Sequence, residues 1–189
     1  MRFKRFQNAG VDVSALAVGT WAMGGRGYGA IDRGECIAAI RAMIDGGVNL
    51  VDTAPCYGNG YSEQLVGEAL EGIRDKVLIS TKVGLVTNAF GGAYGRDASF
   101  HNVMREVESS LINLNTDHID FYFIHWPDLH TPIGETMTAL EFLRKQGKIR
   151  FIGVSNFSQE QIEEAQRYGV IDVQQPPSSM VNQQFAGLM

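Results

Sequence analysis

The stretch VDTAPCYGNGYSEQLVGEAL, residues 51–70, holds the pattern that decides the fold. It begins as an apolar strand that ends at Asp52, and it then crosses a glycine-rich turn that holds Tyr57. A helical pattern follows, entered through Ser62 and Glu63. A strand, a short turn and a helix in this order predict one β/α unit, with a carboxylate and a phenol at the carboxyl end of its strand.

The turn of this unit has a simple conformational explanation. Gly58 and Gly60 indicate a tight turn that needs positive φ. The segment GNGYSE does not fit the phosphate-binding pattern G-x-G-x-x-G, because Glu63 occupies the position of the third glycine. We therefore expect the turn to hold Tyr57 close to the end of the strand.

The same order of elements repeats along the chain. Nearly continuous apolar runs, typical of covered parallel strands, alternate with amphipathic segments, several of which begin at Ser, Thr or Asp and stop at Gly. Asp32 is the expected N-cap of the first helix. The predicted strands are 14–21, 48–53, 76–81, 118–126, 149–155 and 170–175. The predicted helices are 32–47, 62–73, 98–114, 131–147 and 158–169.

These repeats favour a fold of the α/β class, the (β/α)8 or TIM barrel. A doubly wound sheet is the less favoured arrangement, because no dinucleotide-binding fingerprint accompanies the repeats. The residues before the first unit predict an N-terminal β-hairpin. We expect residues 1–189 to form a single, incomplete TIM-barrel domain that contains about six of the eight β/α units.

Length and composition exclude several classes of protein. The chain has 189 residues, is 44% hydrophobic and carries a net charge of −5 with scattered basic residues, so no nucleic-acid partner is expected. No run approaches the roughly 18 apolar residues of a membrane helix, and no apolar segment follows the basic N-terminus. Cys36 and Cys56 fit neither a zinc spacing nor a disulfide framework. These features predict a cytoplasmic protein with no membrane contact and no metal.

Polar side chains end several of the predicted strands. Asp52, Lys82, His125 and the pair Ser155–Asn156 lie at or just past the carboxyl ends of four successive strands. Taken singly, such residues are usually solvated or structural, and Tyr57 alone would more often pin its loop. Four strands in succession are difficult to attribute to chance, because the loops at this end of a barrel converge on one mouth, where barrel enzymes build their sites.

Together these side chains predict acid–base chemistry on a carbonyl group. A tyrosine has a reference pKa near 10, and an adjacent ammonium such as Lys82 lowers that pKa by stabilising the phenolate. Asp52 would keep the lysine charged and oriented, while a neutral His125 could hydrogen-bond the same substrate oxygen. No protein side chain supplies a hydride, so reduction at such a site needs a reduced nicotinamide.

At these residues the chain resembles a known family. The segments VDTAPCYGNGYSE, STKVG, FIHWPD and GVSNF, in this order and spacing, resemble the aldo-keto reductases, NAD(P)H-dependent enzymes on a (β/α)8 barrel. The resemblance runs from ALAVGTWAMGG to QQPPSSMVNQ, nearly the whole chain. It implies Tyr57 as proton donor, with Lys82 and Asp52 as the residues that tune it. It also implies that His125 orients the carbonyl.

The resemblance also implies binding residues. The expected cofactor contacts are Asp52, Gly19, Thr20, Trp21, Ser155, Asn156 and Gln175. The expected substrate contacts are Trp21, Tyr57, His125 and Trp126. For Trp126, packing at the rim of the barrel is an equally good explanation.

The sequence departs from the family pattern in two places. Ser178 stands where the family often has an aromatic residue, and family members continue through two further β/α units after the position of Met189. Those units carry the aromatic that stacks on the nicotinamide and the basic loop that grips the adenosine phosphates. The segment GGRGYG, residues 24–29, is better explained as a mobile loop over the mouth. The resemblance therefore implies a truncated barrel that binds cofactor poorly alone and could self-associate through open sheet edges.

The predicted function is NAD(P)H-dependent reduction of aldehyde or ketone carbonyls to alcohols, with Tyr57 as general acid. The expected partner is a small carbonyl substrate, and the expected cofactor is NADPH, with NADH as the alternative. Two other functions stay open. One is a non-catalytic cofactor-binding or interaction protein on the same fold, and the other is an inactive truncated fragment.

Overall fold

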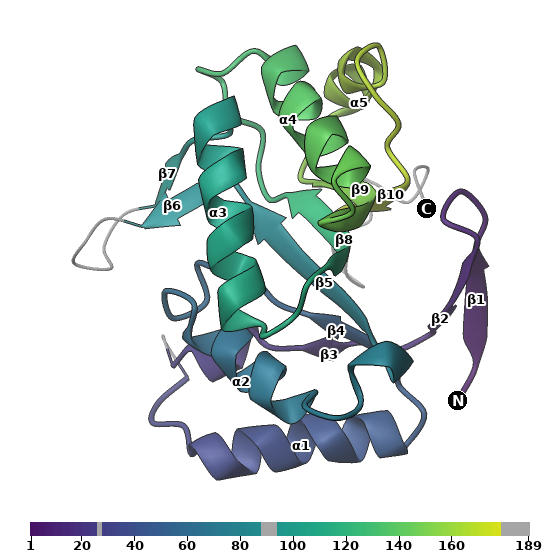
Figure 1. Cartoon of the computed structure of the whole chain (residues 1–189), viewed down its shortest axis with the longest axis vertical. Coiled ribbons are helices and arrows are strands. Elements are labelled where there is room, and N and C mark those ends of the chain that lie inside the picture. The colour runs from purple at the N-terminus through teal and green to yellow at the C-terminus, as the bar shows by residue number, and fades with distance from the viewer. Residues whose placement is uncertain (26–27, 88–93, 179–189) are drawn as a thin grey trace.

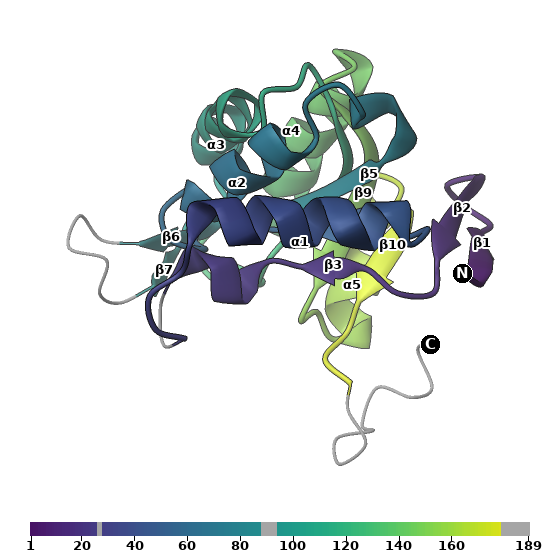
Figure 2. The ribbon, with the colours of Figure 1, turned by 90° about the horizontal axis from the view of Figure 1, so that it is seen from below.

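A curved parallel sheet forms the centre of the computed structural model, which describes residues 1–25, 28–87 and 94–178. Its strands are β3 (Val18–Gly19), β4 (Leu50–Asp52), β5 (Leu78–Val83), β8 (Ile119–Ile124), β9 (Ile149–Ser155) and β10 (Val173–Gln175). Their spatial order, β10-β9-β8-β5-β4-β3, follows the order of the chain. Each neighbouring pair is parallel, and helices cover the outer face of the resulting half-barrel (Figures 1 and 2). The predicted (β/α)8-type fold with six strands is confirmed.

Short polar caps start three of the helices on the outer face. Asp32 accepts a hydrogen bond from the backbone N–H of Glu35, as predicted, while Ser99 caps the third helix and Ser158 forms a capping box with Gln161 at the fifth. The α-helices are α1 (Arg33–Asp45), α2 (Tyr61–Ala69), α3 (Phe100–Asn113), α4 (Ile133–Lys145) and α5 (Gln159–Ala165). Two short 3-10 helices, η1 (Trp21–Gly24) and η2 (Arg74–Lys76), lie in connections.

Within the described residues, two antiparallel hairpins accompany the sheet. The predicted N-terminal hairpin consists of β1 (Phe3–Phe6) and β2 (Val11–Ser14). The second hairpin, β6 (Leu85–Thr87) with β7 (Tyr94–Arg96), directly follows β5 and was not predicted. Its strands are three residues long, which is too short to display the alternation that identifies a strand in a sequence.

Two predicted boundaries are wrong in ways that matter for the site. Helix α2 begins at Tyr61 rather than at Ser62, because Gly60 turns the chain in a left-handed conformation with φ of 88°. The Ser62 side chain is therefore buried inside the protein and does not cap the helix. Strand β5 continues to Val83, so Lys82 projects from the strand itself rather than from the loop after it.

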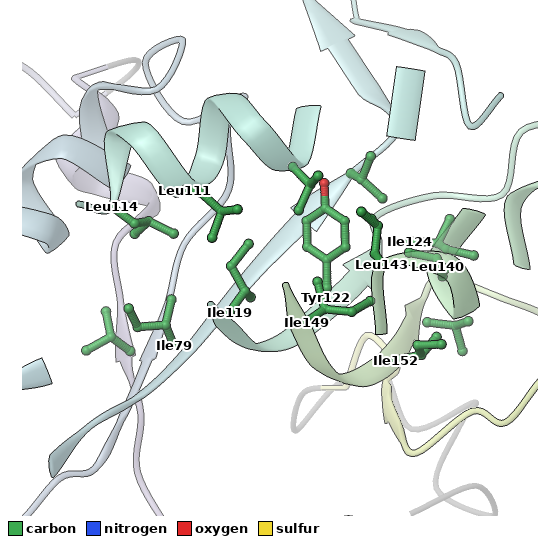
Figure 3. Close-up of a cluster of buried hydrophobic side chains, with 14 of the residues drawn as sticks. Ile79, Leu111, Leu114, Ile119, Tyr122, Ile124, Leu140, Leu143, Ile149 and Ile152 are labelled. Atoms are coloured by element: carbon green, nitrogen blue, oxygen red, sulfur yellow. The ribbon is translucent and has the colours of Figure 1, made fainter. Parts of the chain in front are cut away.

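Apolar side chains fill both faces of the sheet. The larger cluster lies between the strands and the helices, and Tyr122, Ile119 and Ile152 belong to it (Figure 3). A smaller cluster inside the barrel contains Phe121 and Phe123, and the N-terminal hairpin packs against it. This packing holds the strands rigidly, so that the side chains at their carboxyl ends occupy defined positions.

Candidate active site

The carboxyl ends of the strands bring the predicted polar residues to one edge of the sheet. Asp52 is the last residue of β4, and Lys82 lies one residue before the end of the adjacent strand β5. His125 directly follows β8. Ser155 and Gln175 are the last residues of β9 and β10 and face each other in the register of that pair. Five successive strands of the sheet therefore end in predicted site residues at the same edge.

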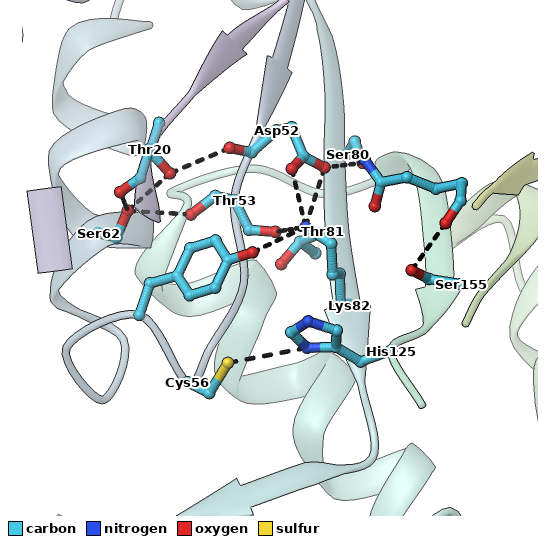
Figure 4. A network of polar contacts seen from close by, with 12 residues as sticks. Thr20, Asp52, Thr53, Cys56, Ser62, Ser80, Thr81, Lys82, His125 and Ser155 are labelled. Carbon is cyan, nitrogen blue, oxygen red and sulfur yellow. Dashed lines mark hydrogen bonds and ion pairs between the residues drawn. The ribbon is translucent and has the colours of Figure 1, made fainter. Parts of the chain in front are cut away.

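Lys82 is the centre of this arrangement. Its side chain is almost completely buried, with the residue 2% exposed. The Nζ atom lies 3.0 and 2.9 Å from the two carboxylate oxygens of Asp52 and donates to the carbonyl oxygen of Thr53 at 2.8 Å (Figure 4). Ser80 donates a further hydrogen bond to Asp52 at 2.8 Å. The ammonium is thus buried together with a carboxylate that neutralises it.

Tyr57 lies against this ion pair. Its hydroxyl oxygen is 3.4 Å from Lys82 Nζ, and the same nitrogen lies 5.1 Å from the centre of the phenol ring. The expected positive φ values of Gly58 (69°) and Gly60 (88°) are confirmed. A methyl group added at Gly24 would lie 2.7 Å from the backbone carbon of Tyr57, so η1 holds the turn by direct backbone contact.

His125 is fixed through its backbone as well as its ring. Its N–H donates to the carbonyl oxygen of Val83 at 3.0 Å, and its own carbonyl accepts from Asn156 Nδ2 at 2.8 Å. The imidazole lies edge-on to the Tyr57 ring, with centroids 6.1 Å apart. Burial and, to a smaller extent, the positive charge of Lys82 lower the pKa of His125 to about 4. The imidazole is therefore neutral at physiological pH.

The residues before α1 that were predicted to contact the cofactor lie next to Asp52. Gly19 pairs with Asp52 in the sheet, and the buried Thr20 donates its hydroxyl proton to the Asp52 carbonyl oxygen at 3.1 Å. Trp21 is 59% exposed, and its ring centre lies 6.5 Å from that of Tyr57. Of the segment 24–29, residues 26 and 27 lie outside the described residues.

Uncharged polar groups and Trp126 lie near the carboxyl ends of β8, β9 and β10. Ser155 donates its hydroxyl proton to the carbonyl oxygen of Gln175 at 3.0 Å, and Asn156 Nδ2 lies 3.1 Å from the Ser155 hydroxyl oxygen. Trp126, which follows His125, is 38% exposed, and the guanidinium of Arg96 lies 5.2 Å from its ring centre. Trp126 is thus in contact with the hairpin β6–β7 as well as adjacent to the mouth.

Several residues that shape the site were not identified from the sequence. Ser62 donates to the Thr20 hydroxyl at 2.7 Å and joins α2 to the mouth. Cys56 places its sulfur 3.7 Å from Nδ1 of His125. Glu63 is buried behind Lys82, accepts a hydrogen bond from Thr81 at 2.7 Å, and has a pKa raised by burial. Serine, cysteine and glutamate next to a turn carry no specific sequence signal, and their contacts exist only after folding.

The described residues contain neither a cluster of metal ligands nor a membrane-spanning helix. Within residues 1–25, 28–87 and 94–178, no group of three or more His, Cys, Asp or Glu side chains is placed to hold a metal ion. None of the described helices is both long and apolar enough to cross a lipid bilayer.

The sequence of the chain is similar to those of known reductases. The chain is 40% identical over 187 residues to the aldo-keto reductase YhdN of Bacillus subtilis, covering 98% of the chain and 56% of that protein. It is 37% identical to the NADH-specific methylglyoxal reductase of Escherichia coli, covering 91% of the chain and 57% of the relative. The chain therefore spans little more than half the length of the curated relatives it matches.

Solved structures show the same similarity. The glycerol dehydrogenase of Gluconobacter oxydans superimposes with a TM-score of 0.87 at 37% identity, over 100% of the chain and 58% of that structure. An aldo/keto reductase of Klebsiella pneumoniae in complex with NADP and acetate superimposes with a TM-score of 0.71 at 36% identity, over 85% of the chain and 52% of that structure. The model of the Aldo/keto reductase family matches residues 15–187. Because that match takes in every strand and helix of the half-barrel, the chain belongs to the aldo/keto reductase family.

Proposed function

We propose that the chain carries the acid–base machinery of a nicotinamide-dependent reductase that converts aldehydes or ketones to alcohols, with Tyr57 as the general acid. One observation supports this most strongly. A nearly completely buried ammonium, Lys82, lies between the carboxylate of Asp52 and the hydroxyl of Tyr57, 2.9 Å from the first and 3.4 Å from the second. An ion pair between Lys82 and Asp52 with only a structural role would not need the hydroxyl of Tyr57 next to the ammonium.

The buried ion pair suits Tyr57 to proton donation. When Tyr57 gives its proton to the substrate oxygen, a phenolate forms next to a positive charge in a poorly solvated place, where that charge stabilises it strongly. Asp52 and Thr53 hold the ammonium in position before the proton moves, so no reorganisation is needed during the reaction. The carbonyl oxygen gains the proton from Tyr57, and the phenolate takes up a proton from water in the next cycle.

A neutral His125 completes the site for the carbonyl. Because its pKa is lowered to about 4, the imidazole is a hydrogen-bond donor that does not compete with Tyr57 for the role of acid at neutral pH. The exposed rings of Trp21 and Trp126 are proposed to form apolar walls of the substrate pocket. The proposed substrate is therefore a small aldehyde or ketone.

The residues of the mouth fit the carboxamide of a nicotinamide ring. Ser155, Asn156 and Gln175 carry one hydroxyl and two carboxamides, all uncharged, and their backbones lie together where β9 and β10 end. Such groups match both the donor and the acceptor of a primary amide. Gly19, Thr20 and Trp21 would lie beside the ring. A reduced nicotinamide, when bound, supplies the hydride that reaches the carbonyl carbon.

The proposed cofactor is NADPH rather than NADH. A solved relative is described in complex with NADP, and a curated relative is NADH-specific. NADH is the alternative. Comparing the turnover rates with NADPH and with NADH in the assay below distinguishes the two.

The test is turnover of 4-nitrobenzaldehyde with NADPH or NADH, followed by loss of reduced-nicotinamide absorbance. Tyr57→Phe should lower the rate by about a hundredfold or more, since general acid catalysis contributes roughly 10²–10⁴-fold. Tyr168→Phe makes the same chemical change at an exposed tyrosine after α5 and should leave the rate unchanged. Equal rates for Tyr57→Phe and the parent would refute the assignment. Cofactor binding by fluorescence titration without any turnover would indicate a non-catalytic cofactor-binding protein instead.

A further inference from the structure

The thiol of Cys56 contacts the ring of His125. Its sulfur lies 3.7 Å from Nδ1, and Cys56 is buried. Figure 4 shows that the other ring nitrogen, Nε2, points away from Cys56 toward the end of Lys82. The turn therefore places the sulfur of Cys56 at Nδ1 of His125, while the next residue, Tyr57, lies against Lys82.

The contact matters because a neutral imidazole exists in two tautomers. One nitrogen carries the proton and donates, while the other accepts, and a hydrogen bond to one nitrogen determines the state of the other. Only the tautomer with the proton on Nε2 can donate to a carbonyl oxygen in the mouth. The contacts of His125 with Val83 and Asn156 fix its backbone and do not distinguish the tautomers of its ring.

The chemistry of the thiol decides the direction of this hydrogen bond. Burial raises the pKa of Cys56 to about 12, so the sulfur keeps its proton at physiological pH. A protonated thiol has one S–H to donate and is a weak acceptor, whereas the unprotonated imidazole nitrogen is a good acceptor. Donation from Cys56 to Nδ1 of His125 is therefore the favourable arrangement.

Lys82 does not supply a competing donor to the ring. An ammonium has three N–H groups, and Lys82 Nζ already faces both oxygens of Asp52, the carbonyl oxygen of Thr53 and the hydroxyl of Tyr57. These contacts use its donors. The thiol of Cys56 is thus placed at Nδ1, where a hydrogen bond favours one of the two tautomers.

We propose that Cys56 is a positioning residue that fixes the tautomer of His125, donating its S–H to Nδ1 and so holding the imidazole proton on Nε2, where it can donate to the substrate oxygen. The catalytic part of this inference rests on the proposed carbonyl reduction. The tautomer itself is a property of the folded chain and can be measured without substrate.

The first test is nitrogen-edited NMR of the histidine rings at neutral pH, which distinguishes the two neutral tautomers. The parent protein should show His125 protonated on Nε2, and Cys56→Ser, whose hydroxyl also keeps its proton, should preserve that state. Cys56→Ala should give a mixture of tautomers. Cys36→Ala, the same change at the free cysteine on α1, should leave the His125 signals unaltered. Thermal melting confirms that each variant is folded.

The second test is activity. Loss of a weak hydrogen bond should lower kcat for the carbonyl substrate by about two- to tenfold in Cys56→Ala, with recovery in Cys56→Ser and little change in the KM for the nicotinamide. A parent His125 protonated on Nδ1, or an unaltered tautomer in folded Cys56→Ala, would overturn the inference. If the parent and the variants show the expected tautomers but the protein does not reduce aldehydes, the role of Cys56 is supported and the proposed function is rejected.

Discussion

Replacing Lys82 by methionine tests whether the site is built around a buried ion pair. Methionine keeps the length and apolar stem of the side chain but removes the charge that faces Asp52 and Tyr57. Removing one partner of a buried pair costs about 3–5 kcal/mol, because the other charge is left uncompensated. The side chain of Asp52 is 18% exposed and retains a hydrogen bond from Ser80, so a loss of about 3 kcal/mol, at the lower end of that range, is expected.

Urea denaturation at neutral pH, followed by circular dichroism, measures this loss. Lys145→Met, at an exposed position in the last turn of α4, is the matched control and should change the free energy of unfolding by less than about 0.5 kcal/mol. The double variant Lys82→Met/Asp52→Asn removes both charges. It should be more stable than the sum of the two single changes predicts, because neither charge is then buried alone.

His125 reports on the same change independently. The charge of Lys82 contributes to the lowered pKa of this histidine, so Lys82→Met should raise that pKa from about 4 toward, but not to, its ordinary value, since burial remains the larger cause. An NMR titration of the ring measures the shift. A Lys82→Met protein as stable as the parent, with an unchanged His125 pKa, would show that the pair is solvated and would refute the reasoning.

His125, Gly24 and Asp120 each allow a separate test of stability. The pKa of His125 is about 4 in the folded chain and about 6.5 in the unfolded chain, so on acidification the unfolded chain binds the proton first. The free energy of unfolding should therefore fall as the pH drops from about 6.5 to about 4. In urea titrations, His125→Gln should remove up to about 3 kcal/mol of this pH-dependent loss of stability. Gly24→Ala should push the backbone of Tyr57 and cost about 1–3 kcal/mol in thermal melts as well as most of the turnover. Asp120→Ala should cost about 1–3 kcal/mol, because it leaves the buried backbone N–H of Ile79 without its acceptor and removes the carboxylate that faces Arg74 and Arg150. Asp117→Ala, at an exposed carboxylate, should be neutral.

The half-barrel could be predicted because its signals are local. Apolar runs alternate with helical segments whose caps, such as Asp32 and Ser158, are readable from neighbouring residues. The positions of Asp52 and Ser155 at strand ends follow from the same pattern. The hairpin β6–β7 and the start of α2 at Tyr61 were missed, because three-residue strands and a left-handed Gly60 leave no periodic signal.

By itself, the sequence determined the order of the strands and helices and which polar residues stand near the strand ends, because both depend on hydrophobic periodicity and capping within a few residues. Only the tertiary structure decided that Lys82 is buried against Asp52, that Tyr57 lies 3.4 Å from its ammonium, and that the sulfur of Cys56 faces His125. These contacts join residues 25 to 69 positions apart, and their distances depend on the curvature of the sheet and the packing of the turn. No local pattern in the chain encodes such distances.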